Sequence, residues 1–412
     1  MNVIWSYNIL IYILEVVKMI NQKMRALGAK RSVIRELFEY GKKRKAEIGE
    51  ENVYDFSLGN PSVAAPDVVN QAIVSLTEKE NSISLHGYTS AQGDLGVRTA
   101  IAEYINETYN EEVTADCLYM SVGAAAALTS SLTALVSPGE EVIVPAPYFP
   151  EYKVFIERCG GVIREVLCDE NLQLDVKKIE EAINEKTAAI IINSPNNPTG
   201  VIYTEENIIA LCNALRRGEE RYGHPIYLIS DEPYRELAFD GKVVPYLTKY
   251  YDDTIVSYSF SKSLSIPGER IGYVLVCPRC QDFTSVYQAV CGAGRALGFV
   301  CAPSMLQKIL PSCLGKTADI TIYDRNRRLL LEKLSSYGLE MIRPDGAFYL
   351  FIKSPSGDAN EFCERAKSFE ILIVPSDDFG YPGYARLAYC VTTEQIERAM
   401  PAFEKLANSY RN

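Results

Sequence analysis

Two patterns of hydrophobic residues alternate along most of the chain, one typical of helices and one typical of buried strands. Between about residues 66 and 300, apolar side chains three and four positions apart predict helices, and short continuous apolar runs predict buried strands. Helices are expected at 66–79, 95–109, 124–136, 176–184 and 205–222, and strands at 118–121, 141–145, 162–167, 188–193, 226–230, 254–259 and 271–277. Strands this apolar, separated by helices, are typical of a mostly parallel sheet covered by helices on both faces.

The pattern changes after about residue 302. A long charged helix, an apolar segment, a helix, two strands and a final helix are expected there, at 317–336, 347–352, 359–368, 371–374, 386–390 and 393–407. We therefore predict an α/β protein with a large domain at 58–302 and a smaller α/β domain at 303–412. The N-terminal part, 19–57, is expected to complete the smaller domain with an amphipathic helix at 30–45.

The first 18 residues are unusually apolar. Polar residues at positions 2, 8, 15 and 18 interrupt them, so we do not expect a membrane-spanning helix, which needs about 20 apolar residues. They also lack the basic start and the cleavage site of a signal peptide. Our hypothesis is that translation begins at Met19 and that 1–18 is a start-site artefact. A peripheral membrane anchor is the alternative.

Composition and charge narrow the classes of function. The 412 residues are 47% hydrophobic and 23% charged, as in soluble globular proteins. The net charge of −11, with no basic block, argues against nucleic-acid binding. The eleven cysteines are scattered through apolar runs, which indicates free thiols in a reducing cytoplasm. Cys277 and Cys280 have redox or half-zinc spacing, but no second pair accompanies them, so we interpret them as a turn after a strand.

Lys262 has the most informative surroundings. It belongs to Ser-Phe-Ser-Lys at 259–262, between two apolar runs, and Arg270 follows eight residues later. A buried lysine must be neutral or paired. Neutral lysine amines form imines with carbonyl groups, and pyridoxal phosphate is the carbonyl cofactor that also needs a phosphate site.

Two more segments follow predicted strands, at the edge of an open α/β sheet where ligands bind. In Asn-Asn-Pro-Thr-Gly at 196–200, the Asn197 amide could hydrogen-bond a ring hydroxyl or a carboxylate, with a plain turn as the alternative. In Asp-Glu-Pro-Tyr at 231–234, Asp231 could hold a protonated pyridine nitrogen and Tyr234 could touch the same ring's hydroxyl. A helix-capping aspartate with a core tyrosine is the alternative there.

Small residues at 123–127 carry a predicted strand into a predicted helix. They let the helix N-terminus approach an anion, although close packing without a ligand gives the same composition. The side chains that would complete a phosphate site are Ser259, Ser261 and Arg270.

Two further motifs have alternatives. The aromatic residues of 145–152 could stack on a cofactor ring or belong to the core, and the residues alone do not separate Tyr148 from Phe149. The glycine-rich stretch 292–298 looks like a dinucleotide fingerprint. A predicted helix precedes it where the fingerprint needs a strand, so we reject an NAD site there.

Taken together, these segments resemble the class I/II aminotransferases, which are fold-type I pyridoxal-phosphate enzymes. The resemblance runs from about residue 53 to the C-terminus. Four landmarks come in the family's order: Asn-Pro-Thr-Gly, Asp-Glu-Pro-Tyr, Ser-Phe-Ser-Lys and a late arginine in Tyr-Ala-Arg-Leu-Ala. The resemblance implies the fold-type I architecture, pyridoxal 5′-phosphate (PLP) as the cofactor, and an L-amino acid and a 2-oxo acid as small-molecule substrates.

The resemblance also implies residue roles at the cofactor. Lys262 would form the internal aldimine and then shuttle a proton, and Asp231 would bind the pyridine nitrogen. Asn197 and Tyr234 would hold the 3′-oxygen of the cofactor. The implied phosphate contacts are the backbone at Gly123, Ala124 and Ala125, together with Ser259, Ser261 and Arg270.

Other implied roles concern stacking, the substrate and a second subunit. Phe149 becomes the preferred stacking residue, because the family's stacking aromatic lies three residues before a tyrosine, here Tyr152. Tyr88 resembles the tyrosine that reaches the neighbouring subunit's phosphate, which implies a homodimer with shared sites. Arg386 resembles the arginine that pairs with the substrate α-carboxylate. Gly59 resembles the backbone lining the substrate pocket, to which Asn197 also belongs.

The chain departs from the family pattern at two places. Ala125 stands where the phosphate loop often has a hydroxyl residue, so one side-chain contact is expected to be missing. No residue is assigned to the distal carboxylate of an acidic substrate. Arg295 is a candidate, although we prefer to interpret it as an ordinary surface or interface arginine.

The leading hypothesis is a PLP-dependent aminotransferase. A PLP-dependent C–S β-lyase is the alternative within enzymes, because it would differ in pocket shape and not in Lys262 or Asp231. The alternative outside enzymes is a non-catalytic ligand-binding module of a transcription factor. The N-terminal stretch is too short and too apolar to supply the DNA-binding domain that this module would require.

Overall fold

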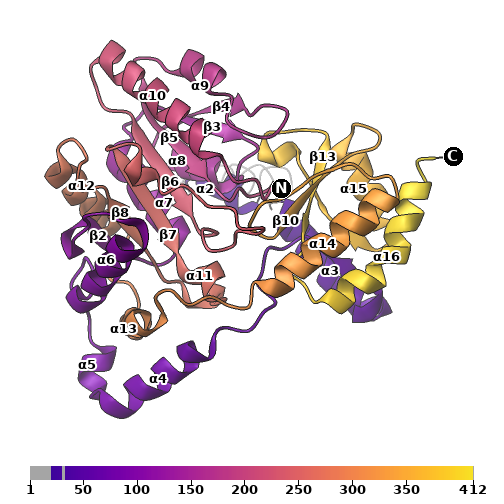
Figure 1. The fold of residues 1–412 in the computed structure, drawn as a ribbon, viewed down its shortest axis with the longest axis horizontal. Helices are drawn as coiled ribbons and strands as arrows, with labels where there is room; N and C mark the ends of the chain where they lie inside the picture. The colour runs from indigo at the N-terminus through magenta and orange to yellow at the C-terminus, as the bar shows by residue number, and fades with distance from the viewer. Residues whose placement is uncertain (1–19, 30–32, 412) are drawn as a thin grey trace, which may run out of the picture.

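A seven-stranded sheet forms the centre of the larger part of the molecule (Figure 1). The structure is a computed structural model, and it describes residues 20–29 and 33–411. The strand order is β2-β8-β7-β6-β5-β3-β4, and all neighbours are parallel except the two pairs made by β8, which confirms a mostly parallel sheet. The strands are β2 (Leu118–Ser121), β3 (Glu141–Ala146), β4 (Val162–Leu167), β5 (Thr187–Asn193), β6 (Tyr227–Glu232), β7 (Thr254–Ser259) and β8 (Gly272–Val276).

Helices cover both faces of this sheet, which explains the continuous apolar runs. On one face, Ile143 and Ile190 pack with α9 (Val176–Ala182) and α10 (Glu205–Tyr222). On the other face, Val142 and Ile191 pack with α7 (Ala124–Leu135) and α8 (Glu151–Arg158). Neighbouring residues of one strand point to opposite faces, so every position of a central strand is buried.

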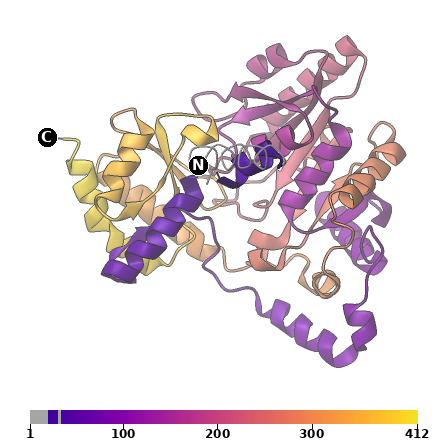
Figure 2. The ribbon, with the colours of Figure 1, turned by 180° about the vertical axis from the view of Figure 1, so that it is seen from behind.

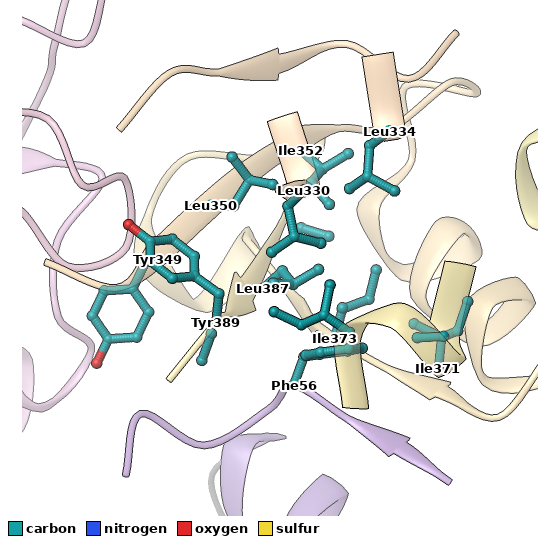
Figure 3. Close-up of a cluster of buried hydrophobic side chains, with 14 of the residues drawn as sticks. Phe56, Leu330, Leu334, Tyr349, Leu350, Ile352, Ile371, Ile373, Leu387 and Tyr389 are labelled. Atoms are coloured by element: carbon teal, nitrogen blue, oxygen red, sulfur yellow. The ribbon is translucent and has the colours of Figure 1, made fainter. Parts of the chain in front are cut away.

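A four-stranded antiparallel sheet lies toward the C-terminus, in the order β12-β13-β10-β9. Figure 3 shows its core, where Leu350 and Leu387 meet Leu330 and Phe56. The strands are β9 (Met341–Ile342), β10 (Tyr349–Lys353), β12 (Val374–Pro375) and β13 (Tyr384–Ala388). The helices of this part are α14 (Thr321–Ser336), α15 (Ala359–Lys367) and α16 (Thr393–Asn408).

The N-terminal helix α3 (Val33–Ile48) packs on this C-terminal part, as the sequence predicts (Figure 2). Leu37 of α3 belongs to one apolar cluster with Val374 and Phe379. Arg44 forms an ion pair of 2.6 Å with Glu370, and β1 (Tyr54–Asp55) pairs in parallel with β11 (Ile371–Leu372). Segments from both ends of the sequence therefore build one smaller α/β unit, while the boundaries at 57/58 and 302/303 stay predictions.

Some expected elements lie outside the described residues or have different bounds. The segment 1–18 lies outside them, so the start-site hypothesis stays open. The helix expected at 30–45 begins in the described chain at Val33 and continues to Ile48, and a separate α2 (Gln22–Ala29) precedes it. None of the described helices is long and apolar enough to cross a membrane.

The sequence pattern does not predict α8 or α13 (Ser304–Cys313). The reason is local, because α8 begins inside the proline-rich aromatic segment 145–152, and α13 starts after Pro303 and contains Pro311. The remaining helices are α4 (Asp67–Lys79), α5 (Ser82–His86), α6 (Leu95–Tyr109), α11 (Phe260–Ser263) and α12 (Phe283–Ala296).

Two motifs with alternative interpretations are resolved by the fold. The glycines of 292–294 lie within α12, so no strand precedes them, and Gly294 lets this helix approach Tyr119 closely. A Cβ at Gly294 would lie 2.0 Å from the Tyr119 hydroxyl oxygen. Cys277 and Cys280 form the predicted turn after β8, in which the Cys280 N–H donates to the Cys277 carbonyl at 2.9 Å.

Candidate active site

A cavity of about 290 Å³ opens where β5, β6 and β7 end and α7 begins. Parallel strands direct their carboxyl ends to the same edge, which is why residues far apart in the sequence meet there. The side chains that bear its polar chemistry are Asn193, Asn197, Asp231, Tyr234, Ser259, Ser261, Lys262, Arg270 and Arg386. The first eight lie at the ends of strands of the large sheet or in the segments that connect these strands. Arg386 comes from β13 of the smaller sheet.

Lys262 lies on α11, a single turn of helix directly after β7. Its Nζ donates to the Gly59 carbonyl at 2.7 Å, and no carboxylate of the described residues forms an ion pair with it. Burial lowers the pKa of the Lys262 ammonium to about 8, and the nearby Arg270 and Arg386 guanidinium groups add to this effect. About a tenth of the amine is therefore a neutral nucleophile at pH 7, far more than for an ordinary lysine.

Asp231 is buried at the end of β6 and lines the same cavity. Its Oδ2 accepts a hydrogen bond of 2.5 Å from the Tyr152 hydroxyl, whereas its Oδ1 has no protein partner. Burial raises the pKa of this carboxyl to about 7, and the Tyr152 hydrogen bond opposes the rise. An unpartnered buried carboxylate oxygen is unfavourable, so it is suited to a cationic N–H donor that binds in the cavity.

The N-terminus of α7 and Arg270 form a cradle for an anion. Gly123 caps α7 with a φ of +88°, and a Cβ there would lie 2.7 Å from the Arg270 Nη2 atom. Only glycine therefore lets the helix start and the guanidinium approach each other this closely. The Ser259 and Ser261 hydroxyls lie 2.8 Å apart beside them. Two hydroxyls, a guanidinium and free helix N–H groups suit a phosphate.

Arg386 is almost fully buried and bonds only neutral groups. Its Nη1 donates to the Asn197 Oδ1 at 3.0 Å and its Nη2 to the Ser57 carbonyl at 2.7 Å, while its Nε has no partner. Among the described residues, no carboxylate forms an ion pair with it, and burial lowers the pKa of its guanidinium. A buried cation without a counter-ion predicts an anionic ligand.

The structure brings most of the predicted site residues together. Gly59, Ala124, Ala125 and Phe149 also line the cavity. Of the two candidate aromatics, Phe149 lines the cavity, whereas Tyr148 does not and its hydroxyl donates to Glu165 at 2.7 Å.

Two predicted residues lie elsewhere in the single chain. Tyr88 is 99% exposed, in the connection after α5. Arg295 is exposed on α12 and lines a separate hollow with Tyr119 and Val300.

Sequence reasoning misses two residues that line the cavity, Asn193 and Tyr349, and one behind it, Tyr152. Tyr152 is named there only as a spacing marker, and Asn193 only as the end of an apolar run, yet Asn193 donates from Nδ2 to the Asp231 carbonyl at 2.9 Å. Tyr349 is hidden inside the apolar segment at 347–352, and its hydroxyl lies 2.8 Å from that of Tyr234. A polar residue inside an apolar run is the signal that could have found Asn193 and Tyr349, whereas Tyr152 lies on α8 and has no such signal.

Comparisons with known proteins agree with this geometry. The family described as "Aminotransferase class I and II" matches residues 51–403. The aspartate aminotransferase of Thermotoga maritima is 30% identical over 383 residues, which cover 91% of this chain and 97% of that protein. The aspartate/prephenate aminotransferase of Thermus thermophilus is 29% identical over 371 residues, 85% of this chain and 90% of that protein.

A solved structure of an amino transferase from Eubacterium rectale is 54% identical to this chain, and the two superpose with a TM-score of 0.94. The match covers 96% of this chain and 100% of the other.

The fold and the cavity define a transferase of the fold-type I class. The chain belongs to the class I and II aminotransferase family, as the sequence motifs predict, and it is an aminotransferase.

Proposed function

We propose that the chain binds PLP in the 290 Å³ cavity, linked through Lys262, and moves an amino group between an L-amino acid and a 2-oxo acid. The observation that carries the proposal is that three groups without full compensation meet in one cavity. They are the Lys262 amine, which bonds a carbonyl but no carboxylate, the unpartnered Asp231 Oδ1, and the Arg386 guanidinium without a counter-ion. These groups match an aldehyde, a pyridine nitrogen and a substrate carboxylate.

Asp231 and Tyr152 are proposed to hold the pyridine nitrogen of PLP in its protonated state. A protonated ring withdraws electrons from the substrate Cα, which is the chemistry that the cofactor supplies. Asp231 Oδ1 would accept the N–H, and the Tyr152 hydrogen bond favours the ionised carboxylate against the burial that raises the carboxyl pKa to about 7.

Lys262 is proposed to act as the acid and base at the substrate Cα. Its low pKa supports this role, because a group that titrates near the working pH can both accept and donate a proton. Tyr234 and Asn197 border the same space and are proposed to hold the 3′-oxygen of the cofactor, while Phe149 stacks on its ring.

The phosphate is proposed to bind the backbone at Gly123, Ala124 and Ala125 together with the side chains of Ser259, Ser261 and Arg270. Arg386 is proposed to bind the substrate α-carboxylate, next to Asn197 and the backbone of Gly59. A bidentate arginine–carboxylate pair at a buried position fixes the orientation of the substrate as well as binding it.

A homodimer is proposed to complete the site with Tyr88 of the second subunit. The segment with α4 and α5 extends away from the two sheets in both views (Figures 1 and 2), it carries the exposed Val74 and Ile83, and Tyr88 follows it in the sequence. Apolar side chains this exposed support an interface on this segment.

A cytoplasmic location is proposed as well. All eleven cysteines lie in the described part of the chain and are free thiols. Free, mostly buried thiols are typical of proteins from reducing compartments.

One experiment tests the proposed function. Purified protein incubated with PLP should turn yellow, and borohydride should fix the cofactor to a peptide that contains Lys262. Addition of amino acids one at a time should then yield pyridoxamine phosphate and the matching oxo acid. Protein that takes up no PLP contradicts the cofactor, and release of pyruvate and ammonia would instead indicate a β-lyase.

A further inference from the structure

We propose that the amino acid substrate carries an apolar side chain, which binds against Leu58 and Ile34, and not a second carboxylate. This inference rests on the proposed function of the cavity. It goes beyond that proposal because it assigns a substrate class and two residues that determine specificity.

The position of the substrate side chain follows from three consecutive residues. Arg386 donates to the carbonyl of Ser57, and Lys262 donates to the carbonyl of Gly59. A substrate with its carboxylate at Arg386 and its amine near Lys262 must therefore place its Cα beside Leu58. The Leu58 side chain is 41% exposed and lines the cavity, so an apolar surface lies free at this point.

Among the described residues of the single chain, the lining of the cavity offers no further cation for a second substrate carboxylate. Among the described residues, its charged lining consists of Asp231, Lys262, Arg270 and Arg386. Each of them has a partner in the proposed function: the ring nitrogen, the cofactor aldehyde, the phosphate and the α-carboxylate. A second substrate carboxylate would lose its hydration without gaining a cation, which is strongly unfavourable.

A smaller cavity of about 30 Å³ adjoins the first and extends its apolar wall. Ile34 and Phe149 line both cavities, and Val374 and Phe379 close the smaller one. The carboxylates that border it are Glu151 and Asp378, which would repel an acidic side chain. Ile34 belongs to α3, so the N-terminal helix supplies one wall of the substrate site.

The preference separates this chain from relatives that are named as aspartate aminotransferases. Arg295 is the residue that could restore an acidic preference, if a second subunit placed it at this cavity. In the single chain it is exposed in a different hollow, so its effect on substrate choice is a direct part of the test.

The test compares amino acids and unreactive analogues on the PLP-loaded enzyme. We expect kcat/KM for leucine, methionine or phenylalanine to exceed that for aspartate and glutamate by about 100-fold or more. Calorimetry should show 4-methylpentanoate or 3-phenylpropanoate binding at least about 10-fold more tightly than succinate.

Variants assign the preference to the two residues. Leu58→Ala and Ile34→Ala should each weaken 3-phenylpropanoate binding about 5- to 10-fold and leave succinate binding unchanged. Ile34→Arg should shift the preference toward succinate. Ile209→Ala is the matched control, because Ile209 is 43% exposed on α10, away from both cavities, and it should change neither analogue.

Three results would overturn the inference. A PLP-loaded enzyme that prefers aspartate or glutamate overturns it and leaves the proposed function intact. The inference also fails if the enzyme binds succinate more tightly than 3-phenylpropanoate and Arg295→Gln abolishes the succinate binding. Arg295 would then bind the second carboxylate. An enzyme that takes up no PLP contradicts the proposed function itself, and the inference with it.

Discussion

At the residue scale, the site depends on polar groups that the protein buries without fully satisfying. Asp231 Oδ1 and Arg386 Nε have no hydrogen-bond partner from the described chain, and the Lys262 amine bonds only the neutral Gly59 carbonyl. Each is energetically unfavourable in a folded protein unless a ligand supplies the partner. Their convergence is therefore better evidence for a PLP and amino acid site than any one motif.

The reactivity of Lys262 should depend on pH in a defined direction. Because the pKa of its ammonium is lowered to about 8, the protonated form dominates below pH 8 and the nucleophilic amine above it. The rate at which the cofactor-free protein attaches PLP should therefore rise with pH between 7 and 9, with a midpoint near 8. Stopped-flow absorbance measures it, and a rate that stays flat over this range would contradict the assignment. Lys262→Ala should bind PLP without attaching it.

Arg386 should control substrate binding more than cofactor binding. Arg386→Ala removes a buried contact to the α-carboxylate, so KM should rise by two or more powers of ten for every amino acid, which corresponds to about 3 kcal/mol. The absorbance spectrum of bound PLP should change little. An unchanged KM would show that the carboxylate binds elsewhere.

Tyr152 is predicted to act on the cofactor through Asp231. Tyr152→Phe removes a hydrogen bond that lowers the carboxyl pKa, so this pKa should rise further above 7 and PLP affinity should fall about 10-fold. Equilibrium dialysis measures the affinity. Tyr148→Phe is the matched control, because the Tyr148 hydroxyl contacts Glu165 instead, and PLP affinity should not change.

At the scale of elements, the site is built from the ends of strands and the start of one helix. Residues after β5, β6 and β7 converge because these strands are parallel neighbours in the sheet. The α7 N-terminus joins them because Gly123 adopts a φ of +88° and leaves room for Arg270. The geometry of one turn therefore decides whether the phosphate cradle exists.

Gly123→Ala tests that turn. The new Cβ would lie 2.7 Å from the Arg270 guanidinium, at a φ that alanine rarely adopts, so PLP affinity should fall at least about 100-fold. Gly139→Ala is a close control, because Gly139 has a φ of +89° and open space around it. Backbone strain should lower the thermal stability of both variants. Only Gly123→Ala should also lose PLP affinity, because only its Cβ meets Arg270.

At the scale of the whole molecule, two sheets and a proposed second subunit share one cavity. Arg386 comes from the smaller sheet and Ile34 from the N-terminal helix, while the cofactor residues come from the large sheet. The exposed Tyr88 would add a third source. The substrate would therefore bind at the junction of these units.

Subunit exchange tests the proposed contribution of Tyr88. Native mass spectrometry should show twice the mass of one chain. Tyr88→Phe should weaken PLP binding, and Lys262→Ala should be inactive. A mixed dimer of these two variants should regain activity, because one site then combines an intact Lys262 with an intact Tyr88 of the partner. No recovery on mixing would show that Tyr88 does not act across the interface.

The sequence alone determined the mostly parallel sheet, because strands buried on both faces are apolar over most of their length, without the alternation of a half-exposed strand. It also predicted Lys262, Asp231 and Arg270 as candidate cofactor residues from local motifs, and the structure brings all three to one cavity. The sequence also suggested that Gly123 and Arg270 belong to one phosphate site. It could not show how closely the two residues approach each other.

Only the tertiary structure decided the side-chain surroundings of the substrate. Leu58, Ile34 and Tyr349 meet there from three separate segments, and none belongs to a motif. The choice of Phe149 over Tyr148 for the cavity likewise depends on which ring faces inward. The physical reason is that local patterns encode burial and backbone direction, whereas a binding surface is formed by side chains that long-range packing brings together.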